Sequence, residues 1–150
     1  MKNQNQSTES LVLNQNQGFK RSEKYRPIKT QKLIDTFESQ GFEVTAKVLT
    51  RPRKTSKIGY QKHMIRLTRS DLTLKGVNDS RPEIVIINSA DGSTSLRFLL
   101  GIFRMVCANG MVVGDTFDGY RVRHTGNVKP RVIEALDGVI ESFPRIANAI

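Results

Sequence analysis

The stretch FEVTAKVLTRPRKTSKIGYQKHMIRLT, residues 42–68, decides the fold. Its first part, residues 42–50, is rich in β-branched residues, and its last part, residues 60–68, alternates polar with apolar residues. Both patterns are typical of strands. Pro52 and Gly59 interrupt the residues between them, so we expect two antiparallel strands joined by a long, basic connection.

Downstream of this hairpin, three further runs are typical of strands: residues 83–88, 95–100 and 120–124. A polar turn is expected at residues 88–93, and a loop at residues 71–82. Around Asn109-Gly110 two interpretations stay open. One is a hairpin with a type I′ turn, and the other is a short helix that ends at Gly110.

Helices are expected on either side of the strands. The first has Thr30 as its N-cap, an apolar face that includes Phe37, and Gly41 as its stop. The second follows Asn127, and Pro144 is expected to kink or end it. Its apolar stripe consists of Val132, Ile133, Leu136, Val139, Ile140 and Phe143.

The order of these elements predicts an α+β fold. We expect a mostly antiparallel twisted sheet with one short N-terminal helix and one longer C-terminal helix. Residues 1–24 are mostly polar and basic, so we expect them to form a flexible tail. Residues 25–150 are expected to form a single α+β domain.

Composition constrains the partners more than the fold. Lys and Arg total 24 against 14 Asp and Glu, which gives a net charge of +10. Such a charge favours polyanions or an acidic protein surface. The most apolar stretch, residues 96–113, is interrupted by Arg97 and Arg104, so no membrane span is expected. A single cysteine excludes an internal disulfide and fits the cytoplasm of a host cell.

Basic residues are concentrated in one window. No acidic residue occurs between Val44 and Ser70. A basic hairpin suits contacts to phosphates, and Tyr60 at its edge could stack on a base. The predicted nucleic-acid-binding residues are Lys47, Arg51, Arg53, Lys54, Lys57, Tyr60, Lys62, Arg66, Arg69 and Arg104. Lys62 and Arg66 are expected on one strand face, since alternate residues share a face.

Catalytic chemistry has weaker support in the sequence. Cys107 and His124 are a candidate nucleophile and base, although Cys107 also fits a small buried hydrophobe. Asp91, Asp115 and Asp118 could hold a divalent ion, but each lies beside a glycine, as turn residues do. The spacing of zinc ligands is absent. We expect a non-enzymatic protein without a metal or other cofactor.

Several blocks of sequence together resemble a known group of proteins. They are Arg21-Ser-x-Lys-Tyr, Lys62-His-Met-Ile-Arg-Leu, Pro82-Glu-Ile-Val-Ile-Ile-Asn-Ser-x-Asp-Gly, Gly101-Ile-Phe-Arg-Met-Val-Cys-x-Asn-Gly and Arg121-Val-x-His-x-Gly. The pattern is similar to the uncharacterised phage- and plasmid-borne domain-of-unknown-function proteins of enterobacterial cryptic prophages. That resemblance implies a mobile element and longer relatives, and it implies no activity. It also implies a turn histidine where this chain has Ala90.

Two functions follow from these observations. The first is a phage or plasmid nucleic-acid-binding protein that engages single-stranded DNA through the basic hairpin, in protection or annealing. Its sheet would be the platform, and Arg97, Arg121 and Arg123 would extend the path. The alternative is an inhibitor of a host defence complex, of the anti-CRISPR or anti-restriction type. A half-covered C-terminal helix would also allow a homo-oligomer.

Overall fold

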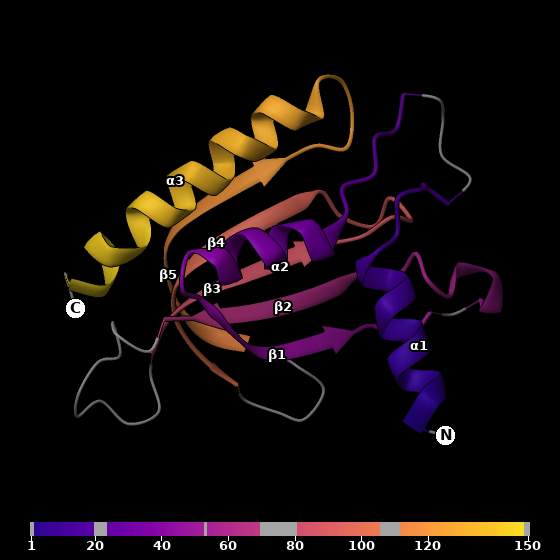
Figure 1. Ribbon diagram of the computed structural model, residues 1–150, viewed down its shortest axis with the longest axis horizontal. Helices are drawn as coiled ribbons and strands as arrows, with labels where there is room; N and C mark the ends of the chain where they lie inside the picture. The colour runs from indigo at the N-terminus through magenta and orange to yellow at the C-terminus, as the bar shows by residue number, and fades with distance from the viewer. Residues whose placement is uncertain (1, 20–23, 53, 70–80, 106–111, 149–150) are drawn as a thin grey trace.

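The computed structural model describes residues 2–19, 24–52, 54–69, 81–105 and 112–148 (Figure 1). Their elements are α1 (Lys2–Leu13), α2 (Thr30–Ser39), β1 (Glu43–Leu49), the 3-10 turn η1 (Thr55–Lys57), β2 (His63–Thr68), β3 (Arg81–Asn88), β4 (Leu96–Met105), β5 (Val112–Val122) and α3 (Val128–Asn148). The strands form one sheet in chain order, each antiparallel to the next. The α+β class and the antiparallel sheet are therefore confirmed.

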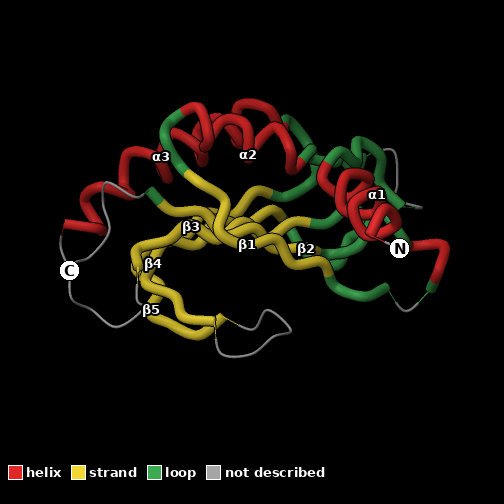
Figure 2. Tube along the Cα trace, turned by 60° about the horizontal axis from the view of Figure 1, so that its bottom comes forward, coloured by secondary structure: helices red, strands yellow, loops and turns green. Residues whose placement is uncertain are grey.

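Helices α2 and α3 cover one face of this sheet (Figure 2). The side chains that point toward them are almost fully buried: Ile65, Leu67, Ile84, Ile86, Leu96, Phe98, Leu100 and Val122. Phe37 of α2 is completely buried, and its ring lies 6.0 Å from that of Phe98. Phe143 of α3 meets Phe42 at 4.9 Å in the same core. The apolar residues that alternate along the strands and those that repeat every 3.6 residues along the helices both point into this layer.

The N-terminal segment departs from the expected flexible tail. Residues 2–13 form α1, where Val12 and Leu13 are each only 2% exposed. Leu13 belongs to the main core. A mostly polar segment becomes ordered here because two adjacent apolar side chains find a preformed surface, a contact that composition alone does not reveal.

Two helix boundaries also differ from expectation. Lys29 is the N-cap of α2 and makes no side-chain capping bond, whereas Thr30 is the first helical residue, with its hydroxyl buried. Helix α3 does not end at Pro144 but continues to Asn148. Proline removes one backbone hydrogen bond, and the adjacent Phe143 stays packed in the core.

The second half of the sheet contains a longer hairpin arm than expected. Strands β4 and β5 pair as far as Met105 and Val112, which supports the hairpin interpretation. Asn109-Gly110 itself lies outside the described residues. Asp115 and Asp118 were interpreted as turn residues, and that interpretation is wrong, because both lie within β5. Strand β3 begins at Arg81, inside the expected loop at 71–82, and the rest of that expected loop, residues 71–80, lies outside the described residues.

The packing of α1 gives a stability prediction. We expect Leu13→Ala to lower the free energy of unfolding by about 2 to 5 kcal/mol, because it removes a buried side chain and leaves a cavity. Urea denaturation measures this value. Leu11→Ala is the matched control, because Leu11 is half exposed and its loss should cost less. Equal, negligible effects of both substitutions would mean that α1 does not contribute to the core.

Candidate nucleic-acid interface

The open face of the sheet consists of the strand side chains that point away from α2 and α3. One row crosses it in register: Val48 pairs with Met64, Met64 with Ile87, Ile87 with Arg97, and Arg97 with Arg121. Val48, Met64 and Ile87 are half-buried, while both arginines are exposed. Within the described residues no helix lies over this row (Figure 2). The row is thus an apolar floor that ends in two neighbouring guanidinium groups.

Those two arginines border a shallow hollow. Arg97 and Arg121 line about 450 Å³ together with Leu99, Gly119 and Tyr120. Gly119 stands opposite Leu99 in the register and contributes no side chain, which leaves room above the sheet. The Arg121 Nε–H donates to Ser95 Oγ at 3.1 Å, which orients this guanidinium. Two adjacent cations repel each other, so an anion bound between them is stabilised.

The basic connection, residues 50–62, lies between β1 and β2. Arg51, Lys54 and Lys62 are exposed there, and Lys57 is half-buried. Arg53 lies outside the described residues. These positions agree with the expected cluster of cations, which the sequence places in a window without acids.

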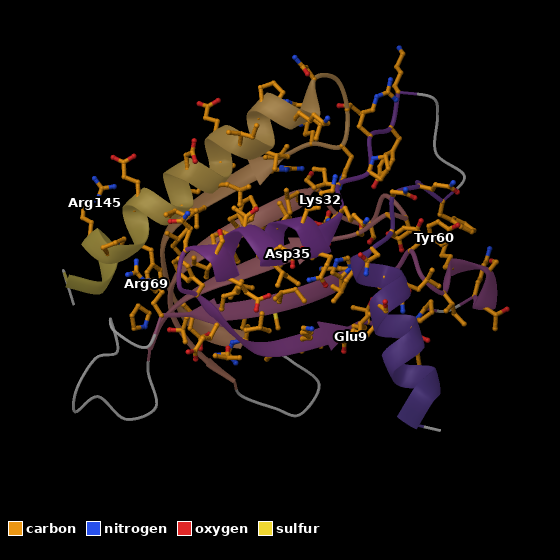
Figure 3. All side chains as sticks on the ribbon, in the orientation of Figure 1. Glu9, Lys32, Asp35, Tyr60, Arg69 and Arg145 are labelled. Carbon is orange, nitrogen blue, oxygen red and sulfur yellow. The ribbon has the colours of Figure 1, made fainter. Side chains whose placement is uncertain are left out.

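Contacts from the N-terminal segment hold the basic connection in place. The Gln15 Nε2–H donates to the Gly59 carbonyl at 3.2 Å, and Gly59 has a positive φ of 98°. A side chain at Gly59 would collide with Leu11 of α1. Lys47 on β1 forms an exposed ion pair with Glu9 of α1, with Nζ and Oε1 3.3 Å apart (Figure 3). Segments expected to be separate are therefore packed together.

Two of the predicted contact residues are engaged inside the protein. The ring of Tyr60 packs against Phe19, with centroids 5.3 Å apart and planes tilted by 57°, so part of this ring is engaged within the protein. The guanidinium of Arg69 lies 5.6 Å from the ring of Phe42, at the other end of the sheet from Tyr60 (Figure 3). Arg69 therefore does not extend the basic connection, within which Tyr60 lies half-buried.

The side chain of Arg66 points away from α2 and α3, as the alternation along the strand predicts, but it is buried and not exposed. It is 7% exposed, and its Nε and Nη2 lie 2.7 Å and 2.6 Å from Glu83 Oε2. Strands β4 and β5 bend, with a register irregularity at Leu100–Gly101, and curve beneath the sheet at this end (Figure 2). Val85, the neighbour of Arg66 in the register, is also buried. Arg104 lies on β4, and its side chain is outside the described part of the chain.

A buried hydrogen-bond chain, the Asn88 network, lies at the sheet end that carries the basic connection. The His63 Nδ1–H donates to the Gln61 carbonyl at 3.0 Å. The Thr30 hydroxyl donates to His63 Nε2 at 2.6 Å and accepts from Asn88 Nδ2 at 2.9 Å. The His124 Nε2–H donates to Asn88 Oδ1 at 2.9 Å. The Gln61 carbonyl can only accept a hydrogen bond, so His63 carries its proton on Nδ1. His63 Nε2 must then accept, and the Thr30 hydroxyl must donate to it.

Both histidines of the network are held neutral. Burial lowers the pKa of His63, against smaller opposing effects of its bond to Gln61 and of Asp91. Burial also lowers the pKa of His124 to about 4. A neutral ring supplies one donor and one acceptor, which is what the His63 bonds require.

The Asn88 network brings together four of the sequence blocks described above. His63, Asn88 and His124 come from three of them, and Tyr25 from the fourth. The ring of Tyr25 stacks on His124 with centroids 5.0 Å apart, and its hydroxyl donates to the Ser89 carbonyl at 3.2 Å. Sequence reasoning considered His124 only as a base or metal ligand and missed this role. The shared blocks were the signal that could have revealed it.

The catalytic alternatives gain no site from this geometry. His124 is engaged with Asn88, and Cys107 lies outside the described residues. Asp91 accepts from the Ser93 N–H at 2.9 Å in a turn, while the other two aspartates lie on β5. In the described ranges, no cluster of three or more His, Cys, Asp or Glu side chains is arranged to hold a metal ion. No helix in those ranges has the length and apolarity to cross a membrane.

Comparison with known proteins gives a family and no activity. Residues 20–150 match a family described as a domain of unknown function, DUF932. The chain is 39% identical over 136 residues to UPF0380 protein YafZ and, equally, to UPF0380 protein YfjQ, both of Escherichia coli (strain K12). Each alignment covers 90% of this chain and 48% of the relative, so the chain spans about half the length of these curated relatives. No solved structure matches it.

The Asn88 network gives a pH prediction. The folded-state pKa values lie below the ordinary 6.5, so the unfolded chain binds more protons between pH 6.5 and about 4. Stability is therefore fully present above about pH 6.5 and is lost as the pH falls through this window. We expect His124→Gln, which keeps an Nε2–H donor, to flatten this loss by about 1 to 2 kcal/mol at pH 5. Urea denaturation at several pH values measures it, and an unchanged slope would contradict the assignment.

Proposed function

The chain belongs to the DUF932 family, a domain of unknown function, and we propose that it is a non-enzymatic nucleic-acid-binding protein that engages single-stranded DNA. The observation that carries this proposal is the row across the open face. There an apolar floor ends in the exposed, cross-strand pair Arg97 and Arg121. Helices and core packing occupy the opposite face, so the open face is the surface on which an extended ligand can lie.

The chemistry of this surface fits a single strand. Arginine binds phosphate through paired N–H groups and also stacks on flat bases. Apolar side chains beside it accept the faces of unstacked bases without reading their sequence. Cations of the basic connection add contacts to the nucleic-acid backbone at one end of the sheet; Arg51, Lys54 and Lys62 are exposed and Lys57 is half-buried. Among the described residues, no helix is presented as groove-reading helices are, which favours a single strand over sequence-specific duplex contacts.

The biological setting is part of the same proposal. Membership of a family of unknown function with relatives in Escherichia coli is what supports this setting. A phage or plasmid-type mobile element, the cytoplasm of its host cell, and a role in protecting or annealing DNA complete the proposed function.

Binding to labelled oligonucleotides tests the proposal. We expect salt-sensitive binding to single-stranded DNA by fluorescence anisotropy, since counterion release dominates such contacts. The double substitution Arg97→Gln and Arg121→Gln should weaken binding about tenfold or more and lower the salt slope by about one to two. Neutralising Arg51, Lys54, Lys57 and Lys62 together should have a similar effect.

A matched control removes the same charge elsewhere. Lys24→Gln with Arg145→Gln neutralises two exposed residues, one before α2 and one on α3, that lie on no strand of the sheet. This pair should change affinity much less than the open-face pair. If no binding to single or double strands occurs at low salt, the proposal is wrong. The basic surface would then point to an acidic partner protein, as in the inhibitor of a host defence complex.

A further inference from the structure

Helix α3 carries two unlike surfaces side by side, away from the open face of the sheet. Ile133 lies between them and is 59% exposed, the highest value among the large apolar side chains in the described residues. It belongs to the predicted apolar stripe of α3, whose other members are buried or half-buried. A core-type residue left at the surface of a packed helix marks a position where another surface can bind.

On one side of Ile133 lies a basic groove between α2 and α3. It encloses about 550 Å³ and has an apolar wall that includes Ile28, Leu33 and Val132. Its charged lining residues are all lysines: Lys29, Lys32 and Lys129. The groove therefore favours an occupant that combines apolar and acidic side chains.

On the other side of Ile133, α3 carries a surface that combines acidic and apolar side chains. Glu134, Asp137 and Glu141 line a hollow of about 600 Å³ with Ile133, Pro130, Gly138 and Tyr120. The three carboxylates are exposed and follow one another along α3 at the spacing of neighbouring turns. This surface has the charge and the apolar centre that the lysine groove requires.

We propose that a second copy of this chain occupies the basic groove, with the acidic side of its α3 against Lys29, Lys32 and Lys129. The lysine groove and the acidic surface both adjoin Ile133. A two-fold axis beside Ile133 therefore satisfies both halves at once, so the assembly closes as a dimer. The helix layers meet in this dimer, and both open faces of the sheets point outward. The inference does not depend on the proposed function.

Charge reversal tests this arrangement. The basic-side variant Lys32→Glu with Lys129→Glu and the acidic-side variant Glu134→Lys with Glu141→Lys each place like charges across the interface. We expect each alone to dimerise at least tenfold more weakly than the unchanged chain, and an equal mixture of the two to form a mixed dimer of restored strength. Sedimentation equilibrium at low salt, from about 1 μM to about 1 mM, covers weak and moderate affinities.

A second test, which does not depend on charge, substitutes Ile133 at the apolar centre of the proposed interface. Ile133→Ser should weaken the dimer, whereas Ile58→Ser, at the 42% exposed Ile58 of the basic connection, should not. All of these side chains are exposed, and an unchanged circular dichroism melt confirms folding. A chain that stays monomeric throughout the range would overturn the proposal. So would a dimer that tolerates all three variants, or larger assemblies in place of a dimer.

Discussion

Asn88 must satisfy both ends of its amide inside the protein, and the rest of the structure depends on how it does so. Its Nδ2 donates to the Ile28 carbonyl and to Thr30, while its Oδ1 accepts from His124. These bonds join β3 to the entry of α2 and to the segment after β5, and Thr30 extends them to β2 through His63. No buried side-chain nitrogen or oxygen in the described part of the chain lacks a partner. Each bond left unmade there would cost about 1 to 3 kcal/mol.

The network also determines which surfaces remain for function. It holds the first residues of α2 and the segment before α3 over one end of the sheet. The face of the sheet that these helices cover is therefore buried in the core. Phe37, Phe98 and Phe143 fill that layer. The two remaining surfaces differ in chemistry. The open face ends in adjacent arginines. In the helix layer, acidic residues of α3 lie on one side of Ile133, and a groove between α2 and α3 lined by lysines lies on the other. Binding of a polyanion and self-association would thus use different surfaces, and these two surfaces adjoin each other at Tyr120.

Much of the fold can be predicted from the spacing of apolar residues and from the glycine and proline residues that end strands and helices, because these signals are local in the sequence. The runs at 42–50 and 60–68 predict β1 and β2, and the apolar stripe predicts α3. What the sequence could not reveal depends on contacts distant in the chain. The period-two pattern gives the direction of Arg66, but only the bending of β4 and β5 buries it against Glu83. Tyr60 has the composition of a stacking residue, and Phe19, distant in sequence, occupies its ring. Arg51, Lys54 and Lys62 of the basic connection are exposed, and their contact with nucleic acid stays a prediction.

Family membership and the proposed function rest on different parts of the molecule. Four of the sequence blocks behind the resemblance meet in the Asn88 network, which is buried and holds neutral histidines. A protein can share this network with its relatives because it needs the same fold, whatever the fold binds. Arg97 lies outside those blocks, and Arg121 is at the edge of one, where it points away from the network. The resemblance therefore reflects the shared scaffold, and the proposed binding of nucleic acid rests on the two arginines and the apolar floor beside them.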